Sequence, residues 1–179
     1  MRLFYGLPLP PDARSAAFAR AQTAQPLLPG RYAIPENYHL TLAFLGEVAQ
    51  ERLPDAQEVL RSCVSRFPAP TITLGAVDHF GRADKAILIL RAQSDPSLGP
   101  LHEKLLLALQ KTDLPCDPGP FSPHVTLARH ADATRLSSLP PACFAPCATF
   151  RAEHACLFLS ARDASDVLRY TPLFRADFM

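Results

Sequence analysis

The chain has 179 residues, of which 18 are Lys or Arg and 17 are Asp or Glu, so its formal charge is +1. This length fits one domain with a sizeable core. A hydrophobic fraction of 48% with 20% charged residues excludes general disorder. A protein that neutralises many phosphates along a nucleic acid needs a marked basic excess, which this chain lacks. Any charge-driven function must therefore be local.

The cysteines and the apolar runs predict a cytoplasmic protein. The 5 cysteines are odd in number and form no Cys-x-x-Cys pair, which fits a reducing compartment better than a disulfide framework. Cys63 falls on a helical apolar stripe, so we expect it to be buried. The longest apolar runs, Ala86 to Leu90 and Leu105 to Leu109, are far shorter than the ~18 residues that a membrane helix needs. We expect no membrane association.

The first half of the chain predicts two strands and two helices. Asp12 is a suitable N-cap for an Ala-rich helix. Apolar residues between Ala56 and Phe67 recur at three- and four-residue spacing, which predicts an amphipathic helix. The predicted elements are a strand at Arg2 to Leu7, a helix from Asp12 to about Gln22, a strand at His39 to Leu45 and a helix from Pro54 to about Arg66.

The second half predicts five strands and one helix, which begins at Pro96 and carries a leucine stripe. The predicted strands are Thr71 to Val77, Ala86 to Ala92, His124 to Ala128, Thr149 to Leu159 and Val167 to Phe174. Strands and helices are mixed without regular βαβ alternation, so the predicted fold class is α+β.

Two strands each carry the pattern His, apolar, Thr, apolar, at His39 to Leu42 and at His124 to Leu127. Side chains alternate faces along a strand, so each His shares a face with the Thr two residues later. The apolar residues anchor each strand through the opposite face. Two such patterns arise by chance in roughly one chain of this composition in 400. The pair therefore indicates a functional surface.

Two imidazoles and two hydroxyls suit an in-line displacement at phosphorus. An unperturbed imidazole has a pKa of about 6.5, so one His can act as a general base and another as a general acid at the same pH. The hydroxyls of Thr41 and Thr126 add donors for phosphoryl oxygens without adding charge. A cyclic phosphodiester fits this set, because opening the ring needs base, acid and positioning, and no metal. The residues alone leave open which His is the acid.

The two patterns and their flanks resemble the two-histidine (2H) phosphoesterase superfamily. The flanks are Phe44-Leu45-Gly46-Glu47 after the first pattern, and Pro123 and Ala128-Arg129 around the second. More closely, they are similar to the bacterial RNA 2′,3′-cyclic phosphodiesterases, also known as 2′-5′ RNA ligases. The spacing between the histidines and the strands at both ends of the chain are similar too, so the resemblance covers essentially the whole sequence.

The resemblance implies a bilobal α+β fold in one domain over residues 1–179, with two pseudo-two-fold-related lobes of antiparallel sheet, helices outside and a central cleft. It implies opening of RNA 2′,3′-cyclic phosphate ends to 2′-phosphomonoesters, and the reverse ligation, by a monomer without cofactor or metal. His39 would be the proton donor and His124 the proton acceptor. Thr41 and Thr126 would bind the phosphate.

Arg129 is a further candidate, as a phosphate or base contact. Strand alternation counted from His124 places Arg129 on the opposite face, where it would be only a surface cation. A strand end or a bulge after Ala128 would instead bring it to the site. The other aromatic and His residues have weaker claims. Phe4, Tyr5 and Tyr38 are candidates to stack a base, but each is expected in the core. His79 and His102 are expected at the surface. His130 and His154 are expected to be structural.

Three other functions remain open at this point. The substrate can instead be a small cyclic nucleotide, which the same chemistry would open. The protein can be a non-catalytic RNA-end binder whose histidines only hold phosphate. A zinc site would use His39 and His124 with Cys143 or Cys147, although the spacing of these cysteines does not match that of structural zinc sites.

Overall fold

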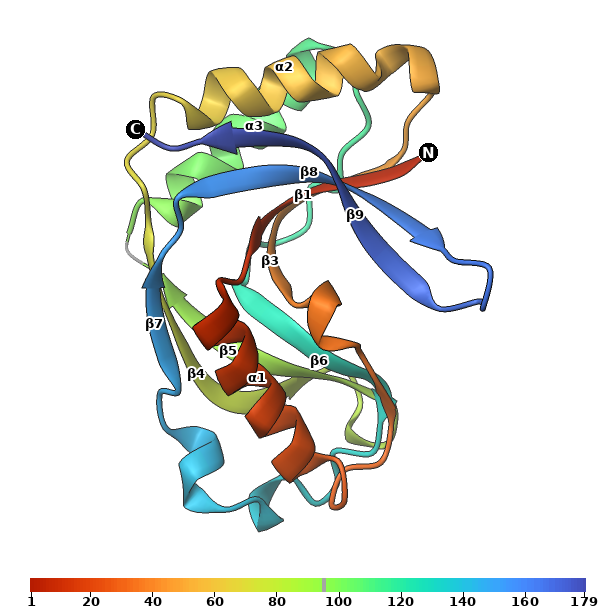
Figure 1. Cartoon of the computed structure of the whole chain (residues 1–179), viewed down its shortest axis with the longest axis vertical. Coiled ribbons are helices and arrows are strands. Elements are labelled where there is room, and N and C mark those ends of the chain that lie inside the picture. Colours follow the sequence, from red (N-terminus) through yellow and green to blue (C-terminus); the bar gives the residue numbers. More distant parts are fainter. Residues whose placement is uncertain (95) are drawn as a thin grey trace.

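In the part of the chain that the structure describes, nine strands form one sheet in which every pairing is antiparallel, and three α-helices pack against it (Figure 1). The structure is a computed structural model of the chain, and it describes residues 1–94 and 96–179. The strands are β1 (Arg2–Pro8), β2 (Arg31–Tyr32), β3 (His39–Glu47), β4 (Thr71–Phe80), β5 (Ala86–Ser94), β6 (His124–Ala131), β7 (Ala148–Arg151), β8 (His154–Arg162) and β9 (Leu168–Asp177). The helices are α1 (Pro11–Ala24), α2 (Leu53–Val64) and α3 (Leu98–Lys111), and the first of several short 3₁₀ turns is η1 (Pro35–Asn37).

The sheet is narrow in its middle, where it divides into two groups of strands. The strand order is β7-β4-β5-β6-β3-β1-β8-β9, and β2 pairs with β6. Within the described residues, β3 and β6 share a single registered pair, Leu40 with Val125. Helix α1 contacts β4, β6 and β7, whereas α2 and α3 pack together against β3, β8 and β9 (Figure 1). The predicted α+β fold of antiparallel sheet with outer helices is confirmed, and the assignment to one domain of two-fold-related lobes stays a prediction.

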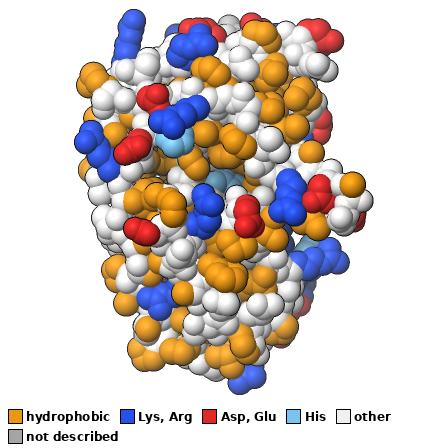
Figure 2. All heavy atoms as spheres, viewed as in Figure 1, with side chains coloured by type: hydrophobic (Ala, Val, Ile, Leu, Met, Phe, Trp, Pro, Cys, Tyr) orange, Lys and Arg blue, Asp and Glu red, His pale blue; other side chains and the backbone are white. Residues whose placement is uncertain are grey.

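The apolar stripes of α2 and α3 are buried, as their spacing predicts. On α2, the stripe that includes Val59, Leu60 and Cys63 is buried, which confirms the expected burial of Cys63. Helix α3 buries its leucine stripe in the same core. On the face shown in Figure 2, Lys and Arg side chains are interspersed with Asp and Glu and with hydrophobic groups. Burial and charge thus follow the ordinary pattern of a packed domain.

Several predicted boundaries are wrong. The segment from Thr149 to Leu159 is two strands, because β7 pairs with β4 while β8 pairs with β1. Hydrophobic alternation continues across this change of partner and so does not reveal it. Helix α1 is capped by Pro10, which places Asp12 in its first turn instead of at the N-cap. Helix α3 begins at Leu98, two residues after the predicted start.

No helix within residues 1–94 or 96–179 is long and apolar enough to cross a membrane. The short strand β2 was not predicted, because its two residues carry no periodic signal and are defined only by pairing with β6.

Candidate active site

The two His-x-Thr strands lie side by side at the middle of the sheet. Leu40 of β3 pairs with Val125 of β6, and both side chains are fully buried. In this antiparallel register the residues that flank the pair alternate to the other face, so His39 lies beside Thr126 and Thr41 lies beside His124. All four of these side chains are partly exposed. We call the face that carries them the histidine face.

Both imidazoles are oriented by the same main-chain contact. The Nδ1 atom of His39 lies 2.7 Å from the carbonyl oxygen of Asn37, and Nδ1 of His124 lies 2.7 Å from that of Ser122. A carbonyl can only accept, so each ring donates from Nδ1. In its neutral form each ring therefore has its lone pair on Nε2. In His39 this atom accepts from the Thr41 hydroxyl at 3.0 Å.

The aromatic surroundings of the two histidines are partly alike. Tyr170 meets the ring of His39 edge-on, with centroids 4.9 Å apart, and Phe80 meets His124 with the same centroid distance and the same interplanar angle of 87°. His39 also contacts Phe4, at 4.7 Å between centroids. It is therefore the more enclosed imidazole.

This difference in enclosure affects the pKa values of the two histidines. Burial lowers the pKa of His39 to about 4, assisted by the charges of His124 and Arg129 and opposed by the Asn37 carbonyl. Burial also lowers the pKa of His124, again with a contribution from Arg129 and against the Ser122 carbonyl. Both rings are thus neutral at pH 7. The charge of Arg129 thus acts on both rings.

A β-bulge turns Arg129 toward the histidine face. Leu88 of β5 pairs with Ala128 and Ile89 pairs with Thr126, which leaves Leu127 as the extra residue of the bulge. Leu127 and Ala128 are consequently both buried, and Arg129 is exposed. The bulge on which the prediction for Arg129 depended exists, one residue earlier than expected. Arg129 thus lies with the four side chains of the two patterns.

A cavity of about 320 Å³ adjoins His124 and Thr41. Phe44, Phe80 and Phe121 form much of its wall. Its remaining lining residues come from β3, α3 and the loop before β6, and they are Leu42, His102, Asp117, Gly119, Pro120 and Ser122. An apolar, aromatic cavity beside groups suited to phosphate chemistry has the character of a nucleobase site.

The expectation that His102 lies at the surface is wrong. Its side chain is 9% exposed, its Nδ1 donates to the Leu42 carbonyl at 2.7 Å, and its ring stacks on Phe121 with centroids 4.5 Å apart. The loop before β6 covers this part of α3. A polar residue beside an apolar helical stripe gives no sign that a distant loop will pack over it.

The remaining sequence candidates do not join the site as ligand-binding groups. Phe4, Tyr5 and Tyr38 are at most 3% exposed, so they are core residues and not free base-stacking platforms. No group of three or more His, Cys, Asp or Glu side chains in the described ranges is placed to hold a metal ion, so neither Cys143 nor Cys147 completes a metal site with His39 and His124. His79 and His154 are half-buried, and His130 is exposed.

Sequence reasoning missed the residues that orient the two histidines. Asn37 and Ser122 act through main-chain carbonyls, which any residue type supplies, so their identity carries no signal. Phe80 and Tyr170 reach the rings from strands whose pairing is unknown before folding. The one regularity that was available is that both carbonyls belong to the second residue before a histidine.

Comparison with known proteins identifies the family. Residues 10–164 match the 2′-5′ RNA ligase superfamily. The chain is 32% identical over 178 residues to the RNA 2′,3′-cyclic phosphodiesterase of Escherichia coli (strain K12), covering 97% of this chain and 94% of that protein. It is 36% identical over 154 residues to the Thermus thermophilus protein of the same name, covering 80% of this chain and 75% of that one.

Solved structures agree with these matches. The crystal structure of E. coli LigT complexed with 3′-AMP has a TM-score of 0.77 at 30% identity, covering 99% of this chain and 97% of that one. A crystal structure of a protein from Thermus thermophilus has a TM-score of 0.80 at 26% identity, covering 99% of this chain and 98% of that one. The resemblance carried by the two His-x-Thr patterns is thereby confirmed, and the chain belongs to the 2′-5′ RNA ligase superfamily.

Proposed function

We propose that this protein hydrolyses the 2′,3′-cyclic phosphate ends of RNA to 2′-phosphomonoester ends. The observation that carries the proposal is the histidine face, on which two imidazoles present Nε2 atoms beside two Thr hydroxyls and one guanidinium. The names of the relatives in E. coli and T. thermophilus support it. So do the crystal structures of E. coli LigT complexed with phosphate and with 3′-AMP.

In the proposed reaction, His124 is the base and His39 is the acid. Nε2 of His124 takes a proton from water, whose oxygen bonds to phosphorus. The bond from phosphorus to O3′ breaks, and Nε2 of His39 gives its proton to O3′. Thr41, Thr126 and Arg129 hold the phosphoryl oxygens, on which negative charge is concentrated throughout. The products are a 2′-phosphomonoester and a 3′-hydroxyl. The same step with an RNA 5′-hydroxyl in place of water would form a 2′-5′ phosphodiester and again release the 3′-hydroxyl, which is a 2′-5′ ligation.

The electrostatics support this division of roles once substrate is included. A base must be neutral before reaction, and the lowered pKa of His124 keeps it neutral. An acid must be protonated, yet burial lowers the pKa of His39 to about 4. A bound phosphodiester places negative charge beside His39 and offsets the charge of Arg129, and both effects raise the pKa of His39. Substrate binding would therefore favour the protonated form of His39, which the acid role requires.

The cavity beside His124 offers a place for the terminal base. Phe44 and Phe121 supply aromatic surfaces within reach of a nucleotide whose phosphate lies on the histidine face. Stacking on aromatic side chains tolerates any base. This arrangement binds one nucleotide tightly and little of the RNA backbone, in agreement with a formal charge of +1. Action as a monomer in the cytoplasm, without cofactor or metal, remains a prediction within this proposal.

Replacement of either histidine tests the proposal. We expect His39→Ala and His124→Ala each to lower the rate on an oligonucleotide with a 2′,3′-cyclic phosphate end by about 10³-fold or more. Near wild-type rates in either variant would overturn it. A mononucleotide 2′,3′-cyclic phosphate turned over much faster than the oligonucleotide would instead support the small-nucleotide function. Tight binding of the 2′-phosphate product without turnover between pH 5 and 8 would support end binding alone.

A further inference from the structure

Asn37 is a buried polar residue that lies two positions before His39. Its side chain is 8% exposed, and both of its polar atoms are paired. Nδ2 donates to the carbonyl oxygen of Leu168 at 2.7 Å, and Oδ1 accepts from the Tyr170 amide at 3.1 Å. Its own carbonyl accepts from Nδ1 of His39. One residue therefore connects β9 to the imidazole at the centre of the site.

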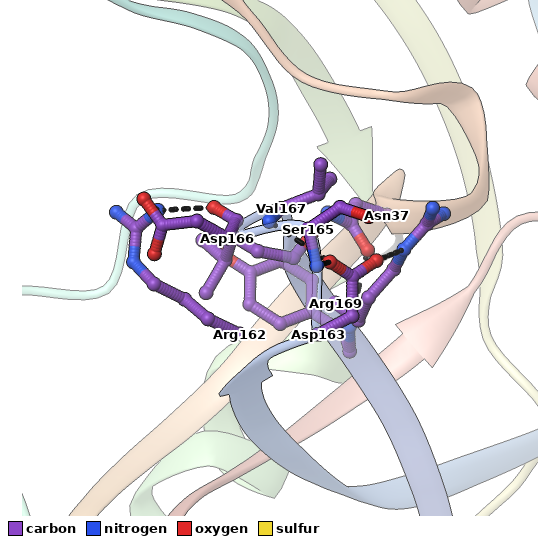
Figure 3. A network of polar contacts seen from close by, with 9 residues as sticks. Asn37, Arg162, Asp163, Ser165, Asp166, Val167 and Arg169 are labelled. Atoms are coloured by element: carbon purple, nitrogen blue, oxygen red, sulfur yellow. Dashed lines mark hydrogen bonds and ion pairs between the residues drawn. The ribbon is translucent and has the colours of Figure 1, made fainter.

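Strand β9 holds His39 from two directions. The ring of Tyr170 meets the imidazole edge-on, and the Tyr170 amide binds Asn37, whose carbonyl fixes Nδ1. This end of β9 is itself ordered by a polar network at the turn between β8 and β9 (Figure 3). There Asp163 accepts from the amide of Val167 at 3.0 Å and from Nε of Arg169 at 2.9 Å. The position of Asn37 is thus set by a braced hairpin.

His124 has no equivalent arrangement. The carbonyl that orients it belongs to Ser122, an exposed residue of the loop before β6. Among the described residues, no side-chain hydrogen bond from Ser122 to another element is found, whereas Asn37 makes two to β9. The two imidazoles share a main-chain contact, but only the contact of His39 is tied to a second strand.

We propose that Asn37 is a positioning residue for His39. By fixing its own carbonyl against β9, it holds the His39 ring in the tautomer that carries hydrogen on Nδ1 and aims Nε2 at the reacting phosphate. The catalytic consequence rests on the proposed function. Asn37 does not face the substrate, so its role is in the rate of the chemical step and not in binding. Tyr170 completes the arrangement by blocking rotation of the ring.

The decisive comparison is Asn37→Ala against Tyr5→Phe. Tyr5 is also buried, and its hydroxyl donates to the Ala56 carbonyl at 2.7 Å, but it does not contact His39. Each variant removes buried hydrogen bonding between distant segments, so we expect both to lower the melting temperature by several degrees. We expect only Asn37→Ala to lower kcat, by about 10- to 100-fold with KM changed less than about 3-fold.

A spectroscopic readout separates positioning from general destabilisation. Ring ¹⁵N NMR distinguishes the two neutral tautomers, so we expect Asn37→Ala to convert His39 from the single Nδ1–H form to a mixture while the His124 signals stay unchanged. This measurement needs no turnover, so it still tests the positioning role if the wild-type protein fails to open cyclic phosphates. An unchanged His39 tautomer in folded Asn37→Ala, or an equal fall of kcat in Tyr5→Phe, would overturn the proposal.

Asn37→Asp provides the conservative variant. The carboxylate keeps an acceptor for the Tyr170 amide but sets an oxygen against the Leu168 carbonyl. Its negative charge also stabilises the imidazolium form of His39. We expect kcat between those of the wild type and Asn37→Ala, with the alkaline limb of the kcat profile moved to higher pH. A rate as low as that of Asn37→Ala with no movement of that limb would contradict the role.

Discussion

Phe44 and Arg129 occupy equivalent places in β3 and β6, each five residues after the histidine and each just past a bulge. In β3 the extra residue is Leu42, because Tyr5 pairs with Ala43 and Gly6 pairs with Thr41. Both bulges reverse the alternation, so an aromatic ring and a guanidinium are exposed beside the imidazoles. The two strands thus repeat one geometry and place different chemistry at its end.

Arg129 should strengthen substrate binding and lower the pKa of both histidines. Removing its charge deprives the phosphate of a charge-assisted hydrogen bond, so we expect Arg129→Ala to lower kcat/KM by about 10- to 100-fold. Because the charge of Arg129 lowers the pKa of both histidines, its loss should raise those pKa values and move the pH profile to higher pH. Steady-state kinetics between pH 4 and 9 measures both effects.

A matched variant separates these effects from the loss of any surface cation. Arg82 is an exposed arginine paired with Asp84, so Arg82→Ala should leave the kinetics unchanged. Arg129→Lys retains the charge but not the planar fork, and should restore the position of the pH profile better than it restores kcat/KM. An unshifted pH profile in Arg129→Ala would show that the guanidinium does not act on the histidines.

Phe44 should act on affinity. It is 44% exposed and lines the cavity beside His124, so we expect it to stack on the terminal base. Loss of one stacking contact corresponds to about 1–3 kcal/mol, and Phe44→Ala should raise KM about 10-fold or more while kcat changes little. Phe18 on α1 is 39% exposed and does not line the cavity, which makes Phe18→Ala the control. Equal kinetics for the two variants would exclude the cavity as the base site.

How far the sequence predicts this site depends on the kind of contact. His39, His124 and their threonines could be selected because strand alternation is a local property that the sequence displays. The position of Arg129 could not, because a bulge is set by the pairing of β5 with β6 and leaves no mark in hydrophobic periodicity. Asn37 and Tyr170 could not be selected from the sequence either, because they meet only when β9 is in place.

The fold shows the same division. The stripe on α2 and the leucines of α3 were predicted from helical spacing and are buried. The break between β7 and β8 was missed, because each half alternates like a strand and only their different partners separate them. Local periodicity therefore predicts which elements exist, and tertiary pairing decides where they end and what they bring together.

Gly6 lies close to the ring of His39, so a substitution at Gly6 tests how closely this ring is packed. A Cβ atom at this position would lie 3.0 Å from the Leu40 carbonyl oxygen and 3.3 Å from Cδ2 of His39. We expect Gly6→Ala to displace the imidazole, lowering kcat about 10-fold and stability by about 1–3 kcal/mol. At Gly75 the nearest contact of such a Cβ is an ordinary 3.5 Å, so Gly75→Ala should change neither. A fully active Gly6→Ala would show that the ring tolerates this shift.

His39 should make the fold sensitive to acid. Its pKa is about 4 in the folded protein and about 6.5 when unfolded, so the unfolded state binds the proton more readily between these values. The stability contributed by neutral His39 is complete above pH 6.5 and is lost as the pH falls toward 4, by about 3 kcal/mol in all. Urea unfolding at pH 7.5, 6 and 5 should show a shallower decline for His39→Gln than for the wild type.

That comparison isolates His39 from carboxylates that titrate in acid. Asp132 and Asp163 also have lowered pKa values, from hydrogen bonds to Thr134 and Arg169 respectively, and they destabilise both proteins equally on acidification. Only the difference between wild type and His39→Gln belongs to the imidazole. Parallel declines would mean that His39 titrates normally in the folded state.

Anion binding should be coupled to proton uptake by His39. An anion on the histidine face favours the imidazolium, so its pKa rises from about 4 toward the working pH on binding. Sulfate is a suitable probe because it does not titrate near pH 6. Calorimetry at pH 6 in two buffers of different ionisation enthalpy should give different binding heats, equivalent to uptake of up to about one proton. His39→Gln should retain weakened sulfate binding without the buffer dependence. Equal heats for the wild type in both buffers would mean that His39 is not charged by the bound anion, and the acid role would then have to pass to His124.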